Sequence, residues 1–259
     1  MPKSILRFFA LSIVCAAGAF GQGTFGQIAF GGGWQTTFTL LNLDPLNVAS
    51  VTLSFYSDAG SPLSAPVQGV GTLSTYTFTI PARGAQSVVL SGSDSVTSQG
   101  WASMTTAGGV VVRGQGSFRL HVLGRQDSEA VVPLSTSGST QCIIPFPTAP
   151  VLVIPFDNTS GQYITSMAVA NTTNTAQTAS IEFDDQFNTP LVTDTLNLGA
   201  LQHMAFSTID KYPALAGKKG ILRISQATNP ALPNTTNLTV LGLLFNFTGP
   251  FTTILPVAQ

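Results

Sequence analysis

The feature that most limits how this chain can fold is a similarity between its two halves, offset by about 120 to 130 residues. Apolar and polar residues recur at the same alternate positions in five successive blocks. The repeat predicts two copies of one domain, from about Gln27 to Leu134 and from about Val151 to Val257. The matching blocks are GGWQTTFTLLNLD from Gly32 with SGQYITSMAVANTT from Ser160, SVTLSFYSDAGSPL from Ser50 with ASIEFDDQFNTPL from Ala179, TFTIPARGAQSV from Thr77 with TLNLGALQHMAF from Thr195, GWASM from Gly100 with GILRI from Gly220, and VVPL near Val131 with ILPV near Ile254.

Within each copy the hydrophobic period is two residues, as in strands with one buried face. Val51, Leu53 and Phe55, for example, alternate with more polar positions. Charged residues make up only 8% of the chain, against roughly 25% in typical proteins, so the helix formers Glu, Lys and Arg are scarce. The expected fold class is all-β, with two tandem immunoglobulin-like antiparallel β-sandwich domains of about seven strands each. The expected elements are strands at 34–42, 51–55, 74–80, 85–90, 101–106 and 110–123, a turn at SDAGSP, and a helical turn at 209–216.

The N-terminus has the pattern of a secretory signal. Lys3 and Arg7 precede an apolar stretch from Phe8 to Ala19, which is too short to span a bilayer. We expect cleavage between Ala19 and Gln22, and the following GQGTFG is interpreted as a flexible mature N-terminus. No later segment approaches the length of a membrane span, so we expect a secreted, periplasmic or cell-surface protein with no transmembrane span.

These signals divide the chain into four parts. A stretch rich in Ser, Thr and Pro separates the two copies, and its prolines favour an extended path. The expected parts are the signal peptide at 1–22, the first β-sandwich domain at 23–135, a linker at 136–150, and the second β-sandwich domain at 151–259.

Charge and cysteine content restrict the function classes. Once Lys3 and Arg7 are removed, 8 basic and 11 acidic residues give a net charge of −3, which argues against a nucleic-acid-binding surface. Loss of Cys15 with the signal leaves Cys142 alone, so no intramolecular disulfide is expected. Cys142 is interpreted as a small buried hydrophobe, with pairing between chains as the alternative.

No pattern for catalysis, cofactor binding or metal binding is complete in this sequence. No serine has the flanking glycines of a GxSxG motif, and paired zinc-ligand spacings are absent. GQGTFG matches GxGxxG, but a signal peptide rather than a strand precedes it. His121, expected in the last long strand of the first copy, and His203, expected near a strand start in the second, are interpreted as structural or exposed. We therefore expect no catalytic residue, no cofactor and no metal site.

Two further groups of residues have both a functional and a structural interpretation. Asp184 and Asp185, together with Asp157 and Asn158, would supply oxygen ligands for calcium if their loops met at one end of a sandwich. The first copy has no carboxylates at the positions that match Asp184 and Asp185, so solvated turn carboxylates are favoured.

Exposed aromatic side chains in one plane are typical of carbohydrate-binding sandwiches. Trp34, Tyr56, Tyr76 and Trp101 are the candidates in the first copy. Trp34 matches Tyr163 and Trp101 matches an apolar position of the second copy, so a shared packing role is favoured over a sugar platform.

The strings GGGWQTTFTLLN, FYSDAGSPL, IPARGAQSV, KYPALAGKKG and TTILPVAQ resemble those of exported bacterial proteins built from two immunoglobulin-like β-sandwich units, most of them uncharacterised. The resemblance covers nearly the whole mature chain, and it implies fold and export but no catalytic residue. The Cys, Trp, Cys core pattern of immunoglobulin domains is absent.

The expected function is that of a non-catalytic exported binding or structural module with a role in adhesion, surface structure or assembly. Its partner would be a protein or a cell-surface polysaccharide. A carbohydrate-binding accessory module is the alternative, which exposed aromatics in a line would favour. A hydrolase with an unrecognised site comes third, and a cleft holding His203 with a carboxylate would favour it.

Overall fold

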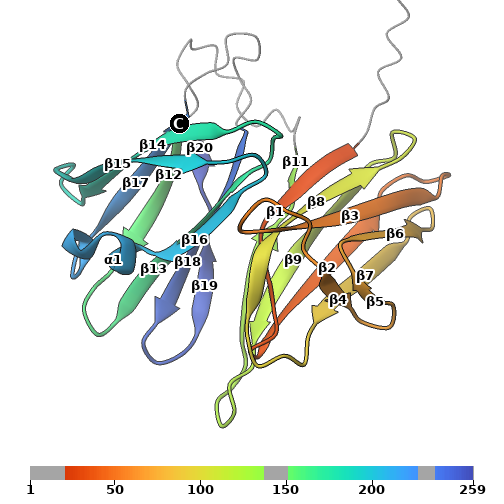
Figure 1. Ribbon diagram of the computed structural model, residues 1–259, viewed down its shortest axis with the longest axis horizontal. Coiled ribbons are helices and arrows are strands. Elements are labelled where there is room, and N and C mark those ends of the chain that lie inside the picture. The colour runs from red at the N-terminus through yellow and green to blue at the C-terminus, as the bar shows by residue number, and fades with distance from the viewer. Residues whose placement is uncertain (1–20, 137–150, 227–236, 259) are drawn as a thin grey trace, which may run out of the picture.

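The computed structural model describes residues 21–136, 151–226 and 237–258, and the regular elements among these residues are nearly all antiparallel β-strands. Figure 1 shows two sandwich-like units side by side, the first coloured red to yellow-green and the second green to blue. The strands of the first half are β1 (Gly21–Phe30), β2 (Trp34–Asn42), β3 (Ala49–Ser57), β4 (Ala65–Val67), β5 (Gly71–Leu73), β6 (Thr75–Ile80), β7 (Ala85–Ser91), β8 (Ser98–Thr106), β9 (Val112–Leu120), β10 (Ser128–Pro133) and β11 (Ser135–Thr136). The elements of the second half are β12 (Val151–Asp157), β13 (Tyr163–Asn171), β14 (Gln177–Asp185), β15 (Pro190–Leu198), β16 (His203–Ser207), α1 (Thr208–Lys211), the 3-10 turn η1 (Pro213–Leu215), β17 (Lys219–Gln226), β18 (Leu238–Asn246), β19 (Phe251–Ile254) and β20 (Val257–Ala258).

The two halves have the same strand order. In the first half, a five-stranded sheet β11-β1-β8-β3-β6 faces a six-stranded sheet β10-β9-β2-β7-β4-β5. In the second half, a five-stranded sheet β20-β12-β17-β14-β15 faces a four-stranded sheet β19-β18-β13-β16. The orders coincide when β12 replaces β1, β13 replaces β2 and the later strands follow in turn; only β4 and β5 have no counterpart.

The core of each half lies between its two sheets, because the alternating apolar residues of facing strands point toward one another. In the first half the fully buried Phe38 of β2 packs against Phe25 of β1 and Phe55 of β3, with ring centroids 4.7 and 6.3 Å away. In the second half Phe156 of β12 meets Phe183 of β14 at 5.3 Å. The contacts of Phe38 join the two sheets of the first half.

A buried threonine occupies the same place in both halves. The Thr36 hydroxyl donates to the Ala29 carbonyl at 2.8 Å and accepts from the Ala29 N–H at 2.9 Å. The Thr165 hydroxyl makes the same pair of bonds with the backbone of Asp157, at 3.0 and 2.8 Å. Each hydroxyl thereby satisfies backbone groups where the first two strands of its half leave each other for opposite sheets.

A buried asparagine is also repeated, at the end of β2 and of β13. The Asn42 side-chain amide donates to the carbonyls of Asn47 and Ile80, at 2.8 and 3.1 Å. The amide of Asn171 donates to Thr175 and Gly199, both at 2.7 Å. Both asparagines are almost fully buried, so these bonds fix the loop that follows each strand.

Several expected elements agree with the structure and others need correction. The strand at 34–42 is β2, and the helical turn expected at 209–216 corresponds to α1 and η1. The GQGTFG segment is wrongly interpreted as flexible, because it belongs to β1, in which Gly23 pairs with Met104 and Phe25 is fully buried. A register shift between Phe25 and Ile28 breaks the two-residue period there, which hides the strand from sequence patterns.

Strand ends also differ from expectation. The strand expected at 110–123 ends at Leu120, so the prediction that His121 lies within it is wrong. Thr136, assigned to the linker, pairs with Gly23 in β11. The short strands β4, β5 and β10 were not predicted. The predictions for Cys15, Cys142 and the linker prolines concern residues outside the described ranges. Among the residues described, no helix is long and apolar enough to cross a membrane.

The two halves meet along β1, which contacts β13 and β18, and along β10, which contacts β19. The hydroxyls of Thr24 and Thr239 are 2.7 Å apart across this junction. Ala168, Leu241 and Phe251 of the second half belong to the same buried apolar cluster as the core of the first half. The junction is therefore a packed interface, and it carries the site described next.

Candidate functional site

A polar clasp joins the halves beside the junction. His203, at the start of β16, has a fully buried side chain whose Nδ1 lies 2.7 Å from Oδ1 of Asp58 in the turn after β3. The His203 backbone N–H also donates to the Asp58 carbonyl at 3.2 Å. Gly60, with φ of +79°, faces the carbonyl of Ala200 so closely that no other residue fits there.

Trp101 forms a second link between the halves. Its side chain is 1% exposed and stacks on Tyr56 at 4.6 Å, and its Nε1–H donates to the Leu201 carbonyl at 2.8 Å. Leu201 has φ of 57°, and Arg83, its match in the first half, has φ of 56°. The same strained turn thus occurs twice, and in the second half it meets the other unit.

The electrostatics of Asp58 favour the charged carboxylate. Partial burial raises its pKa, but the hydrogen bonds from His203 and Gln99 and the charge of His203 outweigh that effect, so the pKa lies below the ordinary value of 3.8. An ionised carboxylate only accepts hydrogen bonds, so Nδ1–H of His203 is the donor in the clasp.

We expect the clasp to lose its contribution to stability in acid. Because the pKa of Asp58 is lowered on folding, the contribution is present above about pH 3.8 and disappears as the pH falls through the folded pKa. The free energy of unfolding of Asp58→Asn should therefore lie below that of wild type at pH 7, and the gap should narrow toward pH 3. Urea titrations across this range measure it, with Asp94→Asn on an exposed loop as the charge-matched control. If the difference in the free energy of unfolding between wild type and Asp58→Asn did not change with pH, Asp58 would not stabilise the fold as a charged carboxylate.

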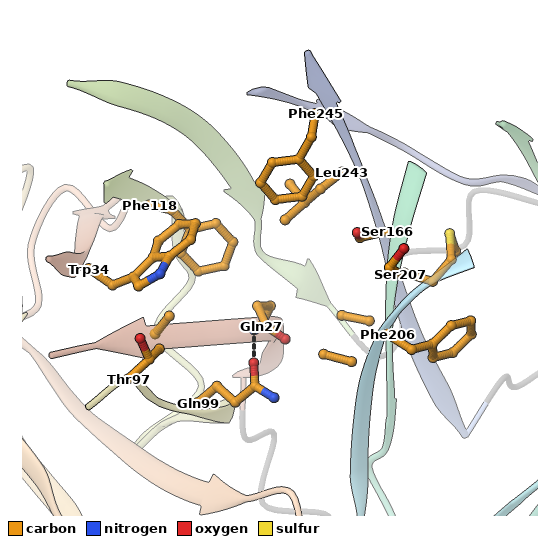
Figure 2. A pocket seen from close by; sticks show the side chains of 14 residues that line it. Gln27, Trp34, Thr97, Gln99, Phe118, Ser166, Phe206, Ser207, Leu243 and Phe245 are labelled. Carbon is orange, nitrogen blue, oxygen red and sulfur yellow. Dashed lines mark hydrogen bonds between the residues drawn. The ribbon is translucent and has the colours of Figure 1, made fainter. Parts of the chain in front are cut away.

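A cavity of about 250 Å³ lies in the junction next to the clasp, between the two halves. Figure 2 shows side chains of both halves facing it, with Trp34 and Phe118 on one side and Ser166 and Ser207 on the other. Most of the lining is apolar, and the polar members are amides and hydroxyls. The lining residues are Gln27, Ala29, Trp34, Thr97, Gln99, Phe118, Ser166, Met167, Ala168, Ala205, Phe206, Ser207, Leu243 and Phe245.

Hydrogen bonds connect the cavity to the clasp and fix the direction of an amide. Gln99 Nε2 donates to Asp58 Oδ2 at 3.0 Å, since the carboxylate cannot donate. Gln99 Oε1 then accepts from Gln27 Nε2 at 3.4 Å, a weak contact drawn as a dashed line in Figure 2. Gln27, only 7% exposed, is left with a buried Oε1 that has no hydrogen-bond partner among the described residues. The hydroxyl of Ser207, which also lines the cavity, is likewise buried and unpaired in the described part of the chain.

The two histidines are not brought together. His121 lies in an exposed loop, where its Nδ1 is 2.7 Å from Asp127. The carboxylate beside His203 has the geometry that would favour a hydrolase, but the Nε2 of this imidazole is buried and contacts no hydroxyl or thiol of the described residues. A catalytic base must reach its nucleophile and the substrate, so His203 is placed to join the halves.

The carboxylates considered for calcium have local partners. Asp184 is buried and forms an ion pair with Arg223. The Asp185 carboxylate accepts from backbone N–H groups of its own turn, and these bonds lower its pKa. Asp157 accepts from the N–H and hydroxyl of Thr159. These contacts give each carboxylate a structural role at its own position.

The four aromatic candidates occupy three different places. Trp34 borders the cavity, Trp101 and Tyr56 form the buried stack at the clasp, and Tyr76 pairs with Phe78 at 5.1 Å. Sequence reasoning missed Gln27, Asp58 and Gln99 entirely. An Asp in a turn and a Gln in a strand carry no signal of their own, because only the docking of the halves gives them partners.

The chain was also compared with known proteins. Neither a scan against protein-family models nor a search of the curated proteins finds a match for the chain.

Proposed function

We propose that this protein is a non-catalytic binding module, exported from the cell and acting in adhesion, surface structure or assembly. The observation that carries the proposal is the junction cavity of about 250 Å³, which both halves line with aromatic, amide and hydroxyl groups. Pockets between two units that are largely apolar and contain a few polar groups are typical ligand sites.

Export and the immunoglobulin-like assignment are part of the same proposal. The basic and apolar N-terminal pattern supports a signal peptide, and β1 begins at Gly21, so cleavage before that residue would leave the strand whole. The repeated strand order supports an internal duplication. The first two strands of each half lie in opposite sheets, whereas those of a constant-type immunoglobulin domain share one, so the immunoglobulin-like relationship stays a prediction.

The experiment uses a variant that fills the cavity. Ala205→Phe places a ring in the lining, and Ala107→Phe, on an exposed turn, is the matched control. Each protein is purified from secreting cells and its intact mass is measured. It is then immobilised on a resin and incubated with native culture fluid or envelope extract. We expect a mature chain that begins near Gly21, and a molecule retained by wild type and Ala107→Phe but not by Ala205→Phe.

Two outcomes would overturn the proposal. Equal retention by all three proteins would mean that the cavity is not the site. Recovery of the molecule in a chemically altered form, with wild type alone producing the change, would mean that the protein is an enzyme.

A carbohydrate-binding accessory module is the second candidate. The observation in its favour is that Trp34 lies in the same cavity as the amides of Gln27 and Gln99, since sugars bind to aromatic faces and polar side chains together. A retained oligosaccharide in the same experiment would favour it.

A further inference from the structure

We infer that the junction cavity binds a small, neutral, planar molecule that carries one N–H or O–H donor, of the indole or phenol class. This inference rests on the proposed binding function and names the chemistry of its ligand. Three properties of the cavity lead to it: the shape and nature of its apolar wall, its charge, and the unpaired polar atoms beside it.

Aromatic rings form one wall of the cavity. Trp34 meets Phe118 edge to face, with centroids 6.1 Å apart and planes at 84°. Trp34 and Phe245 both contact Phe251, at 5.4 and 5.2 Å. A planar ligand gains more from such a wall than an aliphatic one of equal area, because aromatic pairs add edge-to-face or offset-stacked contacts. An engineered cavity of roughly 150 Å³ holds benzene, so about 250 Å³ accommodates one or two fused rings.

The charge of the lining selects a neutral molecule. All the lining side chains are uncharged, and Asp58, the carboxylate bonded to the lining residue Gln99, already accepts bonds from His203 and Gln99. A charged ligand would lose its hydration without gaining a counter-ion, which is costly in an apolar site. A sugar would place several hydroxyls against the aromatic and aliphatic wall without partners, at a similar kind of cost.

The unpaired atoms require a donor on the ligand. Because Gln99 donates to Asp58, its Oε1 is the acceptor that faces Gln27, and this favours the orientation in which the Gln27 NH₂ group points toward Gln99. The Gln27 Oε1 is then a buried acceptor without a donor among the described residues. A buried acceptor that lacks a partner destabilises the protein, because it has lost its hydrogen bonds to water. A ligand N–H or O–H that reaches Oε1 removes this cost, whereas the same ring without a donor does not.

The test compares ligands that differ in one group. Binding of indole, p-cresol, toluene, benzoate and methyl glucoside to the whole mature protein is measured by isothermal titration calorimetry. We expect indole and p-cresol to bind at least about fivefold tighter than toluene, as one added hydrogen bond implies. Benzoate and methyl glucoside should bind more weakly than indole or p-cresol.

Gln27→Met removes the acceptor while keeping the length of the side chain. It should bring the ratio of p-cresol to toluene affinity close to one. Gln86→Met, on an exposed position of β7, should leave the ratio unchanged. The melting temperature of the unliganded Gln27→Met protein should stay close to that of wild type, because the lost oxygen had no partner among the described residues and the lost NH₂ group made only a weak contact with Gln99. This measurement separates a lost contact from a lost fold.

An unchanged ratio in Gln27→Met, a preference for toluene or benzoate, or no binding of any aromatic probe would overturn the ligand class. Tighter binding of methyl glucoside would overturn it in favour of a carbohydrate. None of these outcomes decides the proposed function, which depends on retention of the native ligand by wild type and its loss in Ala205→Phe. The two can therefore fail separately.

Discussion

Gly100→Ala and Gly220→Ala are each expected to destabilise the protein by at least about 3 kcal/mol, a large part of the 5 to 15 kcal/mol of a typical domain. A Cβ at Gly100 in β8 would overlap the Tyr56 carbonyl oxygen and lie 2.9 Å from its carbon. A Cβ at Gly220 in β17 would overlap the Asp184 carbonyl oxygen and lie 2.8 Å from the Asp185 carbon. The obstructing atoms are backbone of the neighbouring strand, so they cannot rotate away, and the strands must separate.

The matched control for these variants is Gly92→Ala, whose Cβ would meet no atom closer than 3.5 Å and which should change stability by less than about 0.5 kcal/mol. Urea unfolding of all three variants measures the difference. If Gly100→Ala were as stable as Gly92→Ala, the close approach of β3 and β8 would be wrong. Similar losses in both halves are expected because the two glycines occupy matching positions in β8 and β17.

Trp101→Ala is expected to cost about 3 to 5 kcal/mol, as for other large buried aromatics. The indole is almost fully buried, stacks on Tyr56 and donates across the junction to Leu201, so its removal leaves a void and takes away one link between the halves. Trp101→Phe keeps an aromatic ring at this buried position but loses the N–H and the volume of the five-membered ring, so it should cost less, about 1 to 3 kcal/mol. Thermal or urea unfolding of both variants measures these values.

Both variants lose the hydrogen bond to Leu201, so the difference between them measures the packing contribution of the ring that Phe retains. Limited proteolysis adds a second measurement, since a weakened clasp should expose the Asp58 turn and the segment around Leu201 to cleavage before the core unfolds. Trp101→Ala with the stability and proteolysis of wild type would mean that the halves do not meet as described.

Much of the fold follows from local patterns in the sequence. The alternation around Phe38 and Phe55 predicts strands with one buried face, because successive strand side chains point to opposite faces. The match of Thr36 with Thr165, and of Asn42 with Asn171, identified residues that make equivalent hydrogen bonds in the two halves. Strand β1 escaped prediction because a register shift interrupts its alternation and its first half is rich in glycine.

The candidate site belongs to the tertiary structure. In sequence, Asp58 looks like an ordinary turn residue and His203 like an isolated histidine, and Gln27 lies at the start of the first copy, outside any predicted strand. Their connection requires contacts between residues 145 positions apart, which no local pattern encodes. The sequence by itself determined the strands, the turns and the repeat, because these depend on side-chain alternation and backbone preference. Only the packing of the first half against the second decided the clasp and the cavity, because burial and hydrogen-bond pairing at a junction depend on both surfaces at once.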